Sequence, residues 1–157
     1  KAFMKVTDVL QPNLTRAKLD GRSKKSTLEL LAELFAEQLG DIDGDSLFTN
    51  FIHRERLGST GFGDGVAIPH CRLPGLRRIH GALISLREPI EFDAADDQPV
   101  DLLFALVVPE EKNEEHLTTL AAIAALLSDS TTRQLLRDCD DHQQLYDQAI
   151  IRDGVVR

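Results

Sequence analysis

An unbroken run of apolar residues in the second half of the chain constrains the fold most strongly. Residues Leu102 to Val108 read L-L-F-A-L-V-V, have the length of a strand and stop at Pro109. A strand with one face in solvent alternates apolar and polar residues, so a continuous run is typical of a strand covered on both faces. The segment 81–86 (G-A-L-I-S-L) predicts a further strand. A sheet containing such strands needs helices packed on both sides.

Helical spacing of apolar residues predicts those helices. Ser26 with Glu29 three residues later forms a capping-box pattern for a helix that stops at Gly40. A second helix runs from the polar turn at 41–45 to Gly58. A third begins with Asn113 as its N-cap and continues to residue 127. The apolar residues that the third helix is expected to bury are Leu117, Leu120, Ala121, Ile123, Ala124 and Leu127.

The remaining segments complete a single α/β domain over residues 1–157. Residues 1–23 are expected to be irregular, with a short helical turn near Val6 that Pro12 interrupts. A strand is expected at 66–68, and shorter helices are expected after Ser130 and over 141–151. Helices alternating with buried strands predict a mixed β-sheet flanked by α-helices.

Composition narrows the function classes. The 157 residues carry a formal net charge of −8, which argues against a nucleic-acid partner that binds through phosphate contacts. No apolar run reaches the roughly 20 residues that span a bilayer, and no signal-peptide pattern opens the chain. The two cysteines, Cys71 and Cys139, lack the spacing of a metal or redox motif. We therefore expect a protein of the reducing cytoplasm with no membrane insertion, metal or cofactor.

A glycine-rich loop leads into the segment that carries the chemistry. Four of the ten glycines lie between Gly58 and Gly65, followed by the apolar run 66–68 and then Pro69-His70. Glycine loses more backbone entropy on folding than other residues, so this loop suggests unusual backbone angles or close approach to a ligand. The loop lacks the glycine spacing of a dinucleotide fingerprint and the Gly-Lys-Ser/Thr of a phosphate loop. A histidine after a proline-fixed strand end can bond one ring nitrogen to a carbonyl and present the other as a nucleophile.

Two other side chains near His70 have a structural and a functional interpretation. Arg54 complements the negative C-terminal end of its helix, or it binds a ligand. His116 lies in the first turn of its helix, where the dipole favours a neutral imidazole that can donate one N–H. Several arginines close in sequence to His70 form either a solvated basic face or a site for an anion; they are Arg54, Arg56, Arg72, Arg77 and Arg78.

The remaining titratable residues offer weaker candidates. Cys71 beside His70 is either a reactive thiol or, as we favour, a small residue tolerated at the site. A metal held by His70 and His116 lacks a third ligand with suitable spacing. No motif supports a role for the other histidines, which are His53, His80 and His142.

The motif G-S-T-G-F-G-D-G-V-A-I-P-H, with Arg-Glu just upstream, resembles the signature of type-two (fructose/mannitol-class) enzyme IIA domains. These domains belong to the bacterial phosphoenolpyruvate-dependent phosphotransferase system (PTS). The resemblance covers most of the chain, because F-D-A at 92–94, D-Q-P-V-D-L-L-F-A-L at 97–106 and H-L-x-x-L at 116–120 are also similar. The Ser23-Lys24-Lys25 segment and the absence of an attached membrane or carrier domain are most similar to the nitrogen-regulatory, PtsN-like branch.

The resemblance implies a function and a set of site residues. His70 matches the histidine that accepts a phosphoryl group on Nε2, Arg54 an arginine that holds the phosphate, and His116 a neighbouring histidine that donates to it. Loop amides are expected to contribute to a phosphate-binding loop made of Gly58, Ser59, Thr60, Gly61, Gly63 and Gly65. Cys71 and Asp64 depart from the family's usual glycine and asparagine, and the extra carboxylate is expected to weaken phosphate retention slightly.

The implied partner is a small HPr- or NPr-like phosphocarrier, and the output is regulation of target proteins such as a transporter or a sensor kinase. Two alternatives stay open. One is an interaction module that works by contact without transfer, and the other is a sugar-specific component that passes phosphate to a membrane permease.

Overall fold

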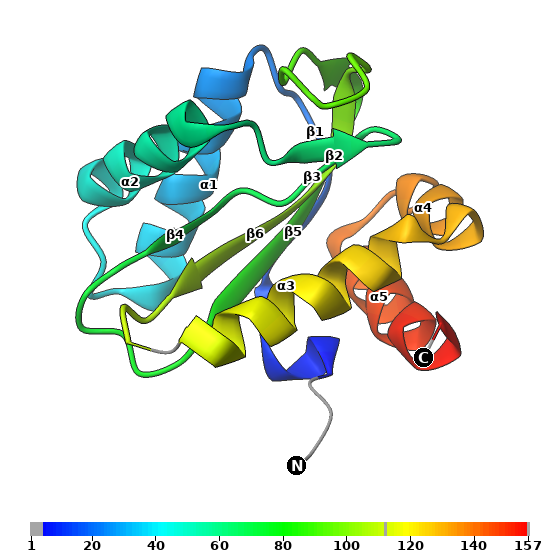
Figure 1. Ribbon diagram of the computed structural model, residues 1–157. Coiled ribbons are helices and arrows are strands. Elements are labelled where there is room, and N and C mark those ends of the chain that lie inside the picture. Colours follow the sequence, from blue (N-terminus) through cyan, green and yellow to red (C-terminus); the bar gives the residue numbers. More distant parts are fainter. Residues whose placement is uncertain (1–4, 112, 157) are drawn as a thin grey trace.

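The apolar run at 102–108 lies in the central strand of the sheet. The computed structural model describes residues 5–111 and 113–156. In it, six strands form one sheet in the order β1-β5-β6-β3-β2, and β4 pairs with β6 beyond the end of β3 (Figure 1). The strands are β1 (Leu10–Leu19), β2 (Gly61–Gly63), β3 (Val66–Ala67), β4 (His70–Arg72), β5 (His80–Ile90) and β6 (Val100–Val108).

The sheet is mixed, as the sequence predicts. Strand β6 is antiparallel to β5 and parallel to both β3 and β4. Strands β1 and β5 are parallel, and β2 and β3 form an antiparallel hairpin. Because β3 and β4 follow the same edge of β6, residues 66–72 run beside it with one interruption at Ile68-Pro69. This arrangement places His70 opposite Leu106, near the carboxyl end of β6.

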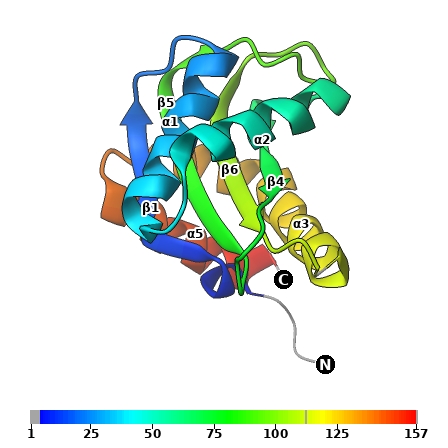
Figure 2. The same cartoon turned by 90° about the vertical axis from the view of Figure 1, so that its left-hand side faces the viewer.

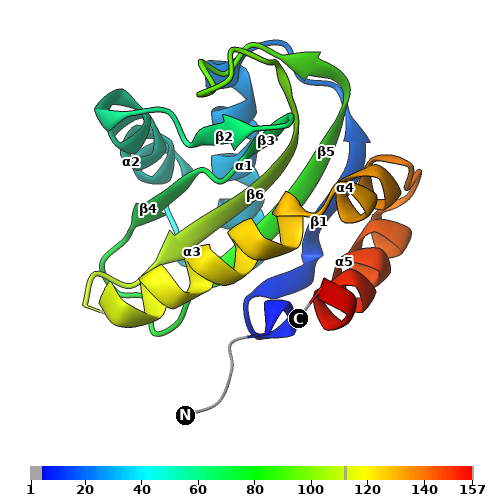
Figure 3. The same cartoon turned by 45° about the vertical axis from the view of Figure 1, so that its right-hand side comes forward.

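Helices cover both faces of the sheet, as Figures 2 and 3 show from two further sides. Helices α1 (Lys24–Leu39) and α2 (Gly44–Leu57) lie on one face. Helices α3 (Asn113–Ser128), α4 (Ser130–Arg137) and α5 (His142–Val156) lie on the other, together with the short 3₁₀ helix η1 (Val6–Asp8). Successive β6 side chains alternate between the two layers, with Leu103 packing toward α1 and α2 and Phe104 toward α3 to α5. None of the described helices is both long and apolar enough to cross a membrane.

The prediction of an irregular segment at 1–23 is wrong for residues 10–19, and its first four residues lie outside the described part of the structure. Residues Leu10–Leu19 form β1, which pairs with β5 at the edge of the sheet with two irregularities in register. Pro12 lies inside this strand, where an edge position tolerates the missing N–H. The expected helical turn near Val6 is present as η1.

Two details of the helices also differ from expectation. Ser23, not Ser26, caps α1, because the Ser23 hydroxyl accepts the Ser26 N–H and the Ser26 hydroxyl accepts the Ser23 N–H in return. In α3, Leu117 is 67% exposed and Ala121 is exposed as well, so the buried face of this helix is narrower than predicted. Asn113 is the first residue of α3, and its side chain, the predicted cap, lies outside the described part of the structure.

Candidate functional site

His70 is held by its own strand in a defined orientation. The peptide before it contains Pro69, whose carbonyl accepts the Leu106 N–H and keeps this segment on the sheet. The Ile68 carbonyl instead lies 2.6 Å from Nδ1 of His70. A carbonyl oxygen only accepts hydrogen bonds, so Nδ1 carries the proton. Nε2 of His70 therefore has a free lone pair, and this nitrogen is the nucleophilic atom.

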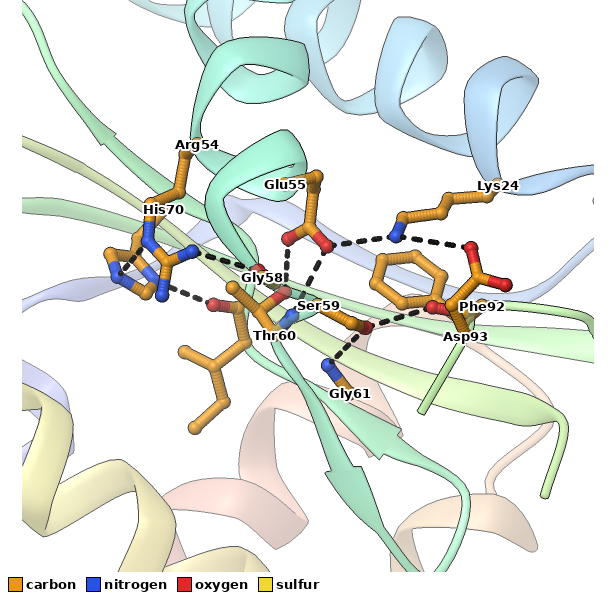
Figure 4. Close-up of polar contacts among 11 residues, drawn as sticks. Lys24, Arg54, Glu55, Gly58, Ser59, Thr60, Gly61, His70, Phe92 and Asp93 are labelled. Atoms are coloured by element: carbon orange, nitrogen blue, oxygen red, sulfur yellow. Dashed lines mark hydrogen bonds and ion pairs between the residues drawn. The ribbon is translucent and has the colours of Figure 1, made fainter. Parts of the chain in front are cut away.

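Arg54 approaches that nucleophilic nitrogen directly. Its Nε donates to Nε2 of His70 at 3.3 Å, and its Nη1 donates to the Gly58 carbonyl at 2.8 Å (Figure 4). The second bond joins the guanidinium to the chain just past the end of α2. The two interpretations of Arg54 are thus compatible, because one side chain stabilises the helix end and reaches the histidine.

Glu55 anchors the turn that positions Arg54. Its buried carboxylate accepts the Thr60 N–H at 3.1 Å and the Thr60 hydroxyl, and it pairs with Lys24 Nζ at 3.1 Å (Figure 4). Lys24 also lies 4.7 Å from the Phe92 ring centroid and 3.7 Å from Asp93. Sequence reasoning used Glu55 only as part of the motif and gave it no role. The position of Glu55 next to Arg54 and three residues before Gly58 is the signal that could have identified it.

His116 reaches the same site from the opposite helical layer. Its ring centroid lies 5.3 Å from that of His70, and the two rings meet edge to face. Burial lowers the pKa of His116 to about 4, with His70, Arg72 and Arg54 acting in the same direction. Burial likewise lowers the pKa of His70, against a smaller opposing effect of the Ile68 carbonyl. Both imidazoles are therefore neutral at pH 7.

A cleft of about 940 Å³ opens over these side chains. His70, His116 and Arg54 all line it, so the structure brings together the three residues that the sequence singles out. Arg72, predicted only as one of several basic residues, lines it too and donates to the Glu110 carbonyl at 2.7 Å. Although Asp41, Asp43 and Glu110 also line the cleft, the groups around His70 are a nucleophilic nitrogen and two guanidinium groups, an arrangement suited to an anion.

The predicted phosphate-binding loop is not part of the described lining of this cleft. Among the described residues that line the cleft, none belongs to the predicted set Gly58, Ser59, Thr60, Gly61, Gly63 and Gly65. The amides of Thr60, Gly61 and Asp64 already donate to Glu55, Ser59 and Asp96, respectively.

The glycines instead allow a tight hairpin. Asp64 and Gly65, both with positive φ, connect β2 to β3, and a Cβ at Gly65 would lie 2.5 Å from Arg137. The loop shapes the site through Gly58 and Thr60, which contact Arg54 and Glu55.

The other candidate residues, Cys71, His80 and His142, are buried or bonded in ways that indicate a structural role. Burial raises the pKa of Cys71 to about 12, so its thiol stays protonated and unreactive. The His80 ring contacts the Gln11 side chain, and His142 accepts the Ala17 N–H. Over residues 5–111 and 113–156, no group of three or more His, Cys, Asp or Glu side chains is arranged to hold a metal.

The chain is similar in sequence to known proteins over most of its length. A family model described as "Phosphoenolpyruvate-dependent sugar phosphotransferase system, EIIA 2" matches residues 8–152. The chain is 45% identical over 144 residues to "Nitrogen regulatory protein" of Pseudomonas aeruginosa, with 92% of this chain and 94% of that protein covered.

Solved structures show the same likeness. The crystal structure of nitrogen regulatory protein IIA-Ntr from Neisseria meningitidis matches with a TM-score of 0.82 and 35% identity, covering 92% of this chain and 98% of that one. The crystal structure of IIA mannitol from Escherichia coli, at 15% identity and a TM-score of 0.70 over 88% of this chain and 96% of that one, shares the fold.

Proposed function

The chain belongs to the EIIA 2 family of the phosphoenolpyruvate-dependent sugar phosphotransferase system, and we propose that it is a phosphohistidine carrier with His70 as the acceptor. The resemblance to the nitrogen-regulatory branch is confirmed by the relatives that the chain matches. One observation carries the proposal: the Nδ1 proton of His70 is directed at the Ile68 carbonyl, which leaves Nε2 unprotonated beside Arg54.

The transfer step needs no proton from the protein. The Nε2 lone pair of His70 attacks phosphorus in line, the N–P bond forms, and the bond from phosphorus to the donor's nucleophile breaks. The electron pair of the broken bond leaves with the donor. Positive charge that develops on the ring is stabilised by the hydrogen bond from Nδ1–H to Ile68, which persists in the product. Positioning and charge neutralisation supply most of the catalysis in such transfers.

Arg54 has two successive roles in this proposal. Before transfer its Nε–H occupies the nucleophile's lone pair at 3.3 Å, so that contact must break as phosphorus approaches. The guanidinium then moves to the phosphoryl oxygens, to which it can donate two parallel hydrogen bonds. Arg72 adds a second positive charge in the same cleft.

A neutral His116 protects the product. A phosphohistidine must survive until its acceptor arrives, and a strong general acid beside it would promote hydrolysis. Because the pKa of His116 is lowered to about 4, its ring donates an N–H to the phosphoryl oxygens without readily losing a proton at pH 7. The contacts of His70 with the Ile68 carbonyl and Arg54, and the neutral ring of His116, are all consistent with a stable phosphohistidine.

The donor that fits this chemistry is a small phosphocarrier of the HPr or NPr type, acting in the cytoplasm. The output proposed here is regulatory, through target proteins that distinguish the phosphorylated from the free form, since a phosphoryl group adds charge at one exposed site. Support comes from the identity of 45% with a protein named for nitrogen regulation.

Intact-mass measurement tests the proposal. The protein is incubated with phosphoenolpyruvate, enzyme I and either a sugar-type or a nitrogen-type carrier. We expect a gain of one phosphoryl group, roughly 80 Da, that is lost in acid and absent in His70→Ala. His53→Ala is the matched control, because His53 lines the same cleft and has no proposed role in transfer. An active relay with no mass gain in the wild type would instead indicate a module that acts by contact alone.

A further inference from the structure

Two buried polar atoms without hydrogen-bond partners lie three residues apart on α3. They are Nδ1 of His116 and Oγ1 of Thr119. In the described part of the chain only one other side-chain atom shares this state, Oγ1 of Thr27 on α1. Buried polar groups are nearly always hydrogen-bonded, so two polar atoms left unpaired on one helix require an explanation.

The positions of the two residues make them suitable partners. Residues three apart on a helix are neighbours on its surface, with Cβ atoms about 5–6 Å apart. His116 is 8% exposed and Thr119 is fully buried, so water has little access to either atom. A threonine hydroxyl can donate or accept, so it can pair with an imidazole nitrogen in either protonation state, and it donates when the ring proton is on the other nitrogen.

The hydroxyl of Thr119 does not donate to the carbonyl four residues earlier, which is the usual partner of a helical hydroxyl. Thr118 and Ser128, on the same helix, donate back to the Glu114 and Ala124 carbonyls four residues earlier. Thr119 makes no such bond among the described residues. Threonine populates two side-chain rotamers in helices, which gives its hydroxyl a second direction to take.

We propose that Thr119 is a positioning residue whose hydroxyl, in the second of its two helical rotamers, donates a hydrogen bond to Nδ1 of His116 and holds that ring with its proton on Nε2. His116 lines the cleft while its Nδ1 is buried, so Nε2 is the nitrogen available to a phosphoryl oxygen. This inference rests on the proposed function of His70.

The tautomer decides whether His116 helps or hinders. With the proton on Nε2, the ring donates to the phosphoryl oxygens. With the proton on Nδ1, a lone pair faces those oxygens and repels them. Two tautomers of a neutral imidazole are otherwise close in energy, and a hydrogen bond at the distal nitrogen sets which one is present. Thr119 thus acts through His116 without touching the substrate.

Nitrogen-15 NMR of the imidazoles tests the tautomer in the unphosphorylated protein. In the wild type we expect His116 to be predominantly protonated on Nε2. In Thr119→Val the Nδ1-protonated form should increase, whereas Thr119→Ser should preserve the wild-type state. Thr27→Val is the matched control, because it removes a similarly buried, unpartnered hydroxyl far along the chain and should leave His116 unchanged. An unaltered tautomer in Thr119→Val would overturn the proposal.

A kinetic measurement tests the consequence. The rate of phosphoryl acceptance at His70 should fall about 3- to 10-fold in Thr119→Val, the factor expected for one net hydrogen bond, and recover in Thr119→Ser. In a His116→Gln background, whose amide donor has no tautomer, Thr119→Val should add no further decrease. An equal decrease in that background would show a merely structural effect and refute the positioning role. If the wild type accepts no phosphoryl group, the proposed function fails, and the NMR result still decides the hydrogen bond.

Discussion

Replacing His116 by glutamine should remove a defined part of the protein's sensitivity to acid. The folded protein holds this ring neutral with a pKa of about 4, because burial and the charges of nearby Arg72 and Arg54 oppose protonation. In the unfolded chain the ring has an ordinary pKa of about 6.5. A histidine whose pKa is lowered on folding contributes stability that is present above the unfolded pKa and is lost as pH falls toward the folded pKa.

The size of the effect follows from the two pKa values. Between pH 7 and pH 5 the unfolded chain takes up about three-quarters of a proton at this position, while the folded protein takes up almost none. Linkage then gives an upper limit of about 2 kcal/mol lost from the free energy of unfolding. Because the cleft is open to solvent, which screens the charge, we expect about half of this, or about 1 kcal/mol.

Urea unfolding at pH 7 and pH 5 measures the effect. The wild type should lose about 1 kcal/mol more between these pH values than His116→Gln does. His70, whose pKa burial also lowers, contributes to the acid sensitivity of both proteins, and because its charge opposes protonation of His116, the difference measures the coupled pair. Identical losses in the two proteins, or a greater loss in the variant, would refute the assignment of a neutral His116.

Three further substitutions test the parts that position the site. Gly65→Ala should destabilise the fold by about 1–3 kcal/mol in urea unfolding, since a side chain there meets both a φ of +79° and Arg137. Glu55→Gln should cost about 1–3 kcal/mol in the same assay and slow phosphoryl acceptance, because it removes the charge that pairs with Lys24 and weakens the turn after α2. Arg54→Lys keeps the charge but loses the two parallel donors for the phosphoryl oxygens, so acceptance measured by rapid quench should fall about 10-fold or more, and stability should fall only by the lost contact with the Gly58 carbonyl.

Matched controls distinguish these effects from general damage. Gly40→Ala has a similar positive φ but no atom near the added Cβ, so it should cost less than Gly65→Ala. Asp93→Asn changes the exposed partner of the same lysine, and Arg56→Lys changes an arginine on α2 outside the cleft. If Arg56→Lys slowed transfer as much as Arg54→Lys, charge alone would explain the data and the directed contact would be rejected.

Local patterns predicted the buried strands and most helices, and they failed where tertiary context decided the outcome. The continuous apolar run at 102–108 required cover on both faces, which the structure provides. The strand Leu10–Leu19 escaped prediction because it mixes polar residues with Pro12, a composition that only an edge position tolerates. The cap of α1 was misplaced by three residues because Ser26 with Glu29 matches the usual capping-box pattern, whereas the actual cap, Ser23, exchanges hydrogen bonds with a serine, Ser26.

For the site, the sequence predicted the residue types but not their geometry. His70, Arg54 and His116 come together because β4, α2 and α3 converge on one cleft, which no local pattern encodes. The sequence suggested that the glycine loop binds phosphate. In the structure, Gly65 forms a hairpin with Asp64 and packs closely against Arg137. Spacing cannot distinguish these two uses of glycine, since both require positive φ or close backbone approach.

Phosphorus–nitrogen correlation NMR on the phosphorylated protein, labelled with nitrogen-15 in histidine, tests the central claim most directly. The hydrogen bond from Nδ1 of His70 to the Ile68 carbonyl predicts coupling of phosphorus to Nε2 of that ring alone. Coupling to Nδ1, or to the ring of another histidine, would contradict the account.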